Sequence, residues 1–141
     1  SNTSDSQKTS ENYYGRTLPQ EPSNPSASLA GTDSNNNGVR DDVERALAST
    51  FKSDADFTMS MNGAAELQKI LTDTGSSYSV VERKFTCSTV SLGETNQGLI
   101  RNIVFNTAER QSVIKNSSES QPTSVEITID SSGNAVNPCS N

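Results

Sequence analysis

The sequence contains no histidine and no tryptophan, and only two of its 141 residues are cysteine. Without histidine the chain cannot build a Ser-His-Asp or Cys-His catalytic arrangement, a histidine general base or an imidazole zinc site. It also lacks a Gly-x-Ser-x-Gly elbow and a phosphate-binding glycine-rich loop. No apolar run approaches the length that spans a bilayer. These absences exclude the common catalytic classes, and we expect a protein that is not an enzyme.

Basic residues are scarce as well. The chain has 17 acidic and 11 basic residues, a formal net charge of −6 and an isoelectric point near 4.5. Nucleic acids and anionic membranes both require a basic surface, so neither is expected as a partner, except that an N-terminal anchor could tether the protein to a membrane. Only 30% of the residues are hydrophobic, and the mean hydropathy is −0.66. The length predicts one domain with a modest core.

Residues 33–44 have the spacing of a calcium-binding loop. Oxygen-bearing side chains occupy positions one, three, five, nine and twelve, and Gly38 at position six permits a sharp turn. Calcium prefers six to eight oxygen ligands, which this spacing supplies from one short segment. The predicted ligands are Asp33, Asn35, Asn37, the backbone carbonyl of Val39, Asp41 through a water molecule, and Glu44 with both carboxylate oxygens.

The alternative is a solvated Asn-Gly turn that caps the following helix, because Asn and Asp favour turns and N-caps. Asp41 and Glu44 favour the calcium interpretation, since a simple turn needs neither. Carboxylate pairs can also cleave glycosides. The acidic cluster here is already explained by calcium or by favourable charge at a helix N-terminus. Asp42 is expected to be either an outer-shell group of the site or solvated, and solvation is the favoured interpretation.

This segment resembles the EF-hand loop, and it is more similar to dockerin and thrombospondin type 3 loops, in which an aliphatic residue follows the glycine. Residues 29–44 are also similar to a motif of small, uncharacterised secreted bacterial proteins. Two features depart from a paired EF-hand. Prolines and a glycine before the loop disfavour a preceding helix, and Arg40 replaces the aliphatic residue through which paired hands join by a short strand. No second loop is present, so the resemblance implies a single calcium ion.

The two cysteines, Cys87 and Cys139, are too far apart for a redox motif and lack companions for a metal site. We predict that they form a disulfide, which would constrain the unfolded chain by about 4 kcal/mol. The alternative is two free thiols in a reducing cytosol. A disulfide favours an extracytoplasmic location: the periplasm, the cell surface or the medium. The chain begins at Ser1 without methionine, which fits a processed N-terminus, so the lack of a signal peptide does not bear on the compartment.

The patterning predicts a mainly α fold of about four helices with a small C-terminal strand or hairpin. Residues 1–32, rich in Ser, Asn, Gln and Pro, predict a polar leader or tether, and residues 33–141 a small helical calcium-binding domain. The calcium loop opens the first helix, whose apolar stripe runs from Val39 to Phe51. The other helices are expected over 54–74, 77–92 and 99–114, followed by a strand over 125–129 and a turn at 131–134.

Polar residues 106–111 interrupt the fourth predicted helix. They indicate either a kink that presents Glu109 and Arg110 to a partner, or a helix break capped by Asn106 or Thr107 with a surface ion pair. The break is the favoured interpretation.

Two functions remain compatible with the sequence. The first is an extracytoplasmic calcium-binding protein, secreted or of the lipoprotein type, in which calcium is structural. The second is an adhesion or surface-assembly module, similar to a minor pilin, in which calcium orders a surface that faces a protein partner.

Overall fold

The computed structural model describes residues 10–13, 15–73, 75–120, 129–135 and 139. Within these ranges the protein is mainly α-helical, which confirms the predicted fold class at that level. A two-stranded antiparallel hairpin precedes the helices. The elements are β1 (Ser10–Tyr13), β2 (Arg16–Pro19), α2 (Asp41–Thr50), α3 (Asp54–Thr72), α4 (Tyr78–Thr89), the short 3-10 helix η1 (Val90–Leu92), α5 (Glu94–Val104) and α6 (Ala108–Ser120).

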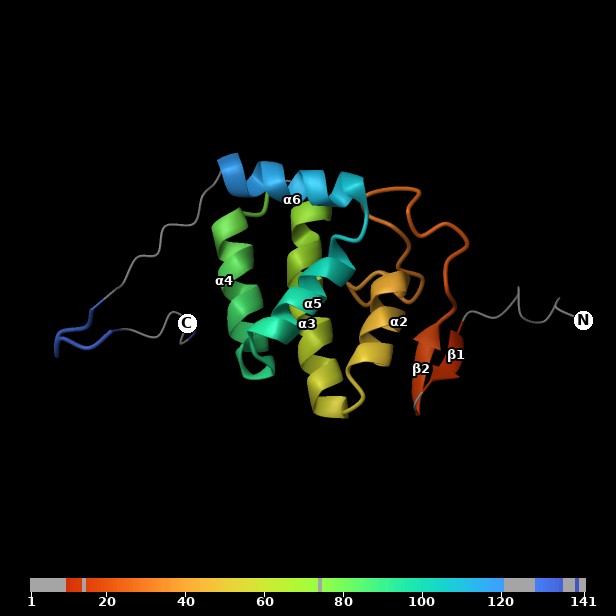
Figure 1. The fold of residues 1–141 in the computed structure, drawn as a ribbon, viewed down its shortest axis with the longest axis horizontal. Coiled ribbons are helices and arrows are strands. Elements are labelled where there is room, and N and C mark those ends of the chain that lie inside the picture. The colour runs from red at the N-terminus through yellow and green to blue at the C-terminus, as the bar shows by residue number, and fades with distance from the viewer. Residues whose placement is uncertain (1–9, 14, 74, 121–128, 136–138, 140–141) are drawn as a thin grey trace, which may run out of the picture.

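Helix α3 is the centre of the fold and packs against each of the other four α-helices (Figure 1). Helices α2 and α4 flank it, α5 crosses it, and α6 lies across one end of the bundle. The core is formed by apolar side chains that these helices turn towards one another, and each is at most 9% exposed. Its buried members are Val39, Val43, Leu47, Phe51, Ala64, Leu67, Leu71, Phe85, Ile100, Val104 and Phe105.

The first two helices begin where the sequence predicts. The apolar stripe of α2 is fully buried, from Val39 at 2% exposed to Phe51 at 5%. Helix α3 starts with Ser53 as its N-cap, and the Ser53 hydroxyl accepts a hydrogen bond from the backbone N–H of Asp56. Such a cap satisfies one of the backbone donors left free in the first turn of a helix. Local sequence therefore sets the short connection between α2 and α3.

Gly63 lies in the middle of α3, where its low helix propensity is unfavourable. A Cβ atom at this position would lie 2.5 Å from Cγ2 of Thr89 and 3.1 Å from the ring of Phe85. The glycine therefore allows α4 to approach α3 closely. The third helix was expected over residues 77–92, whereas α4 ends at Thr89 and is followed by η1 from Val90, a residue that is 64% exposed.

The predicted fourth helix is two helices. Helix α5 ends at Val104 and α6 begins at Ala108, so the polar segment 106–111 marks a break. The Thr107 hydroxyl accepts a hydrogen bond from the backbone N–H of Arg110, which caps the new helix as expected. Arg110 itself faces neither a partner nor solvent, because its side chain is only 1% exposed.

The region predicted to be a polar leader contributes contacts to the fold from Arg16 onwards. Leu18 in β2 is 1% exposed, and β2 packs beside α2. Arg16 donates to the carbonyl of Lys52 and lies 4.3 Å from the ring centroid of Phe57. Packing therefore begins well before residue 33.

The C-terminal part is joined to the bundle covalently. Cys87 on α4 and Cys139 form the predicted disulfide, with their Cα atoms 5.3 Å apart. Ile129 and Ala135 form an antiparallel bridge around the predicted turn, whereas most of the strand predicted over 125–129 lies outside the described residues. Among the described helices, none combines the length and apolar character needed to cross a membrane.

Candidate calcium site

The segment before α2 forms a tight loop around the side chain of Asp33. The carboxylate of Asp33 accepts hydrogen bonds from the backbone N–H groups of Asn37, at 3.2 Å, and Gly38, at 2.9 Å. Two residues of the loop adopt positive φ, Asn36 at 59° and Gly38 at 86°. Glycine and asparagine tolerate this conformation better than other residues, so the composition of the loop matches its backbone.

Two of the three acidic residues in the first turn of α2, Asp41 and Glu44, turn back towards the loop. Asp41 is 2% exposed, and its carboxylate accepts from the backbone N–H of Ser34 at 3.1 and 3.2 Å. Glu44 is 5% exposed, and its Oε1 accepts from the side-chain amides of Asn35, at 3.3 Å, and Asn37, at 2.8 Å. The fold thus brings the side chains of Asn35, Asn37 and Glu44 into contact, while Asp33 and Asp41 bind backbone N–H groups of the same loop.

No lysine or arginine among the described residues balances the charge of this cluster. In the described part of the chain, neither Asp41 nor Glu44 forms an ion pair with a lysine or arginine. Burial raises the pKa of Glu44, and the negative charges of Asp41 and Asp33 raise it further, against the opposing effect of the two amide hydrogen bonds. Burying a carboxylate without a positive partner is costly. The cluster is therefore suited to a cation.

The donor set fits calcium in particular. Its oxygens come from carboxylates, amides and a peptide group, which are hard ligands. The amides of Asn35 and Asn37 turn their nitrogen atoms to Glu44. A half-turn of each amide would present its oxygen instead, which for Asn37 means giving up the hydrogen bond that its Oδ1 accepts from the N–H of Val39 at 3.0 Å. Across the residues that the structure describes, no three His, Cys, Asp or Glu side chains form a group that could hold a metal alone. Asp33, Asp41 and Glu44 therefore do not form such a group by themselves, and the other three predicted ligands are amide or peptide oxygens.

Asp42, the neighbouring acid, is not solvated as expected. Its carboxylate accepts from Nε of Arg40 at 2.9 Å and from the amide of Asn106 at 2.9 Å, and its side chain is 10% exposed. Burial would raise the pKa of Asp42, but the hydrogen bond and charge of Arg40, with the smaller contributions of Asn106 and Arg110, lower it below its ordinary value. Unlike Asp41 and Glu44, this acid is neutralised within the protein, which separates it from the candidate site.

Arg40, at position eight of the loop, is 1% exposed and reaches the break between α5 and α6. There its guanidinium donates to the carbonyl of Val104 at 2.9 Å and to Oδ1 of Asn106 at 3.1 Å. Arg110 donates to the same Asn106 oxygen at 2.6 Å. Through this shared asparagine, the candidate loop is connected to the start of α6.

Arg110 extends the same network to the N-terminal segment. Its guanidinium donates to the backbone carbonyls of Pro25 and Ser28, each at 2.8 Å, and of Leu29, at 3.2 Å. These carbonyls lie more than 80 residues away in the sequence from the side chain that binds them. The predicted surface ion pair is therefore wrong for Arg110, which instead fastens the segment before the loop to the bundle.

Gln68 of α3 also contacts the loop, and sequence patterning did not predict this contact. Its side-chain amide accepts from the backbone N–H of Arg40 at 2.9 Å and donates to the carbonyl of Gly38 at 3.0 Å. Gln68 is 7% exposed. The only signal in the sequence is its place between Leu67 and Leu71 on the buried side of a predicted helix, which does not identify its partner.

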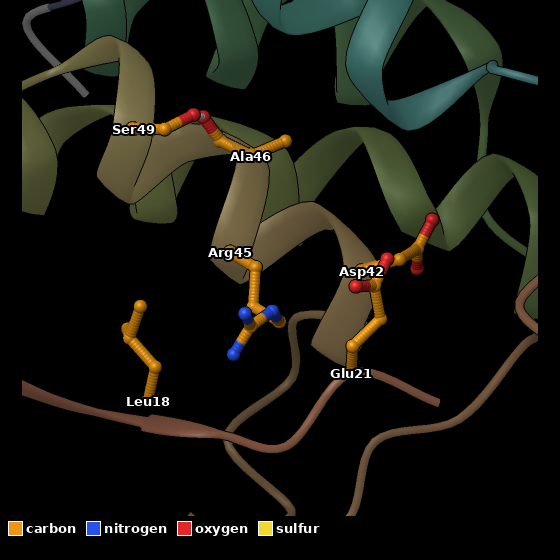
Figure 2. A pocket seen from close by; sticks show the side chains of 6 residues that line it. All are labelled: Leu18, Glu21, Asp42, Arg45, Ala46 and Ser49. Atoms are coloured by element: carbon orange, nitrogen blue, oxygen red, sulfur yellow. Dashed lines mark hydrogen bonds between the residues drawn. The ribbon is translucent and has the colours of Figure 1, made fainter. Parts of the chain in front are cut away.

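A hollow lies beside α2, where β2 and the loop after it face the helix (Figure 2). Leu18 and Glu21 line it from one side, and Asp42, Arg45, Ala46 and Ser49 line it from α2. Two of its three charged groups have internal partners, since Asp42 binds Arg40 and Arg45 donates to the carbonyl of Pro19 at 3.2 Å. This hollow is a weaker candidate than the loop.

No protein-family model, no curated protein and no solved structure matches this chain, so the assignment of a function depends on the geometry of the loop alone.

Proposed function

We propose that this protein is an extracytoplasmic calcium-binding protein in which one calcium ion stabilises the loop over residues 33–44. The observation that carries the proposal is the burial of Asp41 and Glu44 beside Asp33 without a lysine or arginine partner in the described part of the chain. A divalent cation would neutralise this repulsion and offset the cost of burying the two carboxylates.

The ion would be held by the side chains of Asp33, Asn35, Asn37 and Glu44, by the carbonyl of Val39, and by Asp41 through a water molecule. Its role in this proposal is structural. The loop joins the N-terminal segment to α2, and Arg40 within it contacts the break between α5 and α6. An ion that orders the loop would therefore stabilise both neighbours.

The disulfide between Cys87 and Cys139 supports a location outside the reducing cytosol, because such bonds persist in oxidising compartments. Calcium concentrations are also high outside cells, which suits a single loop of modest affinity. The two features agree on an extracytoplasmic setting, in which the protein is secreted or held at a membrane by an anchor.

The test is calcium-dependent thermal stability combined with calorimetry. Protein stripped with EDTA is melted alone, with millimolar calcium and with millimolar magnesium, and calcium is titrated into it at 25 °C. We expect a rise in melting temperature with calcium, little change with magnesium, which prefers a small octahedral shell with several waters, and a measurable heat of binding. If calcium neither changes the melting temperature nor gives a heat of binding, the calcium proposal is wrong and the loop is a solvated turn.

A further inference from the structure

Gln68 on α3 binds the backbone at the centre of the candidate loop. Its amide binds Gly38 through the carbonyl and Arg40 through the N–H group, so its two hydrogen bonds flank Val39 on both sides. A side-chain amide carries one acceptor oxygen and a donor NH₂ group, the same pair of functions as a peptide unit. Gln68 therefore contacts the loop as a single residue of a neighbouring β-strand would.

We propose that Gln68 is a positioning residue for calcium, a role that rests on the proposed function. Val39 is the one ligand that would use a backbone oxygen, and a backbone oxygen has no side-chain torsion with which to adjust. Its direction depends on the peptide groups before and after it. Gln68 fixes a polar group of each neighbour, and the side chain of Val39, at 2% exposed, anchors the same residue in the core.

The surroundings of Gln68 explain why one loop can suffice. Residues 34–38 are exposed on their outer side, and the chain has no second loop to pair with them. Helix α3 packs against the loop, and its buried Gln68 side chain supplies the donor and the acceptor that a paired loop would otherwise provide. The loop is then held in its shape before calcium arrives, and less ordering is required on binding. The inferred site binds one ion without a partner loop and without cooperativity.

A purely structural role for Gln68 makes a different prediction. A buried amide that only satisfies two backbone groups affects the stability of the fold, and its removal leaves the affinity of folded protein for calcium unchanged. A positioning role affects the affinity as well. The two quantities must therefore be measured separately, on protein shown by circular dichroism to be folded.

The experiment compares the wild type with Gln68→Met, which keeps the length of the side chain and removes both hydrogen bonds. Gln97→Met is the matched control, because Gln97 on α5 is partly buried and its amide donates to Thr89 of α4 at 3.1 Å, away from the loop. The dissociation constant for calcium is measured by calorimetry, and the urea midpoint is measured in EDTA. Gln68→Asn is included, since its shorter amide cannot span both backbone groups and it disturbs the core less.

We expect Gln68→Met to weaken calcium binding about tenfold, as loss of a residue that orients a metal ligand commonly does, and Gln68→Asn to weaken it several-fold. Gln97→Met is expected to lower the urea midpoint with a dissociation constant within about twofold of the wild type. A wild-type dissociation constant in both Gln68 variants would overturn the positioning role and leave the calcium site in place. If Gln68→Met does not fold, the Asn variant decides between the two results. Absence of calcium binding by the wild type would overturn the proposed function, and the role of Gln68 with it.

Discussion

Replacement of Glu44 by glutamine is expected to have opposite effects on the calcium-free and the calcium-bound protein. Glu44 is 5% exposed, and its nearest charged neighbours are the carboxylates of Asp41 and Asp33. Glutamine keeps an oxygen that can accept from the amides of Asn35 and Asn37, and it removes the buried negative charge. Calcium-free Glu44→Gln should therefore be as stable as the wild type or more stable, by up to about 1 kcal/mol.

With calcium the order reverses. For a dissociation constant of about 0.1 mM, about 1 mM free calcium stabilises the wild type by roughly 1.4 kcal/mol, or about 5 °C in melting temperature. If loss of the charged ligand weakens binding about a hundredfold, the same calcium stabilises the variant by less than about 0.1 kcal/mol. The variant should therefore have the same or a higher melting temperature than the wild type in EDTA, and a lower one in millimolar calcium.

The assay is differential scanning calorimetry at pH 7 with EDTA and with calcium. Glu119→Gln is the control, because it removes the same charge from an exposed position on α6 and should respond to calcium as the wild type does. A Glu44→Gln variant that is markedly less stable than the wild type in EDTA would refute the argument that the buried charge is unbalanced. If calcium raises the melting temperature of Glu44→Gln as much as that of the wild type, Glu44 is not a calcium ligand.

Further predictions concern the network and the packing. Arg110→Met should destabilise the protein by about 3 kcal/mol, measured in urea, and accelerate proteolysis between residues 20 and 31, because buried carbonyls lose a charged donor. Gly63→Ala should cost about 2 kcal/mol despite the better helix propensity of alanine, since its Cβ meets α4; thermal melts check this. The lowered pKa of Asp42 contributes stability that is present above its unfolded value of 3.8 and lost as the pH falls through the folded pKa, so Asp42→Asn should flatten the acid limb of a pH–stability curve. Unfolded, unreduced protein should titrate no thiols, and reduction of Cys87–Cys139 should cost about 4 kcal/mol.

Local sequence was sufficient for the features that depend on neighbouring residues. The cap at Ser53 and the stripe from Val39 to Phe51 follow from spacing within a few residues. The contacts of Asn35 and Asn37 with Glu44 also follow from spacing, since the loop and the first turn of α2 are continuous. In each case the sequence separation is short enough that backbone geometry alone brings the groups together.

Features that depend on distant contacts were missed or misread. Arg40 and Arg110 carry charges that ordinarily face solvent, yet both are 1% exposed because carbonyls from other elements receive their guanidinium groups. Helix propensity alone marks Gly63 as unfavourable, because propensity does not include the helix packed against it. Gln68 binds residues about 30 positions earlier in the chain, and no local pattern marks that pairing. For these residues the information lies in the packing of the helices.

The most direct test of the central claim is a calcium titration of ¹⁵N-labelled, EDTA-stripped protein followed by two-dimensional NMR. The N–H of Gly38 donates to Oδ2 of Asp33 at 2.9 Å, so a cation on that carboxylate should shift the Gly38 signal strongly. We predict that the largest shifts fall within residues 33–44 and that they saturate with one ion per chain at millimolar calcium or below. Unchanged spectra at 10-fold higher calcium, or shifts confined to acidic residues elsewhere on the surface, would contradict the assignment of this loop as a calcium site.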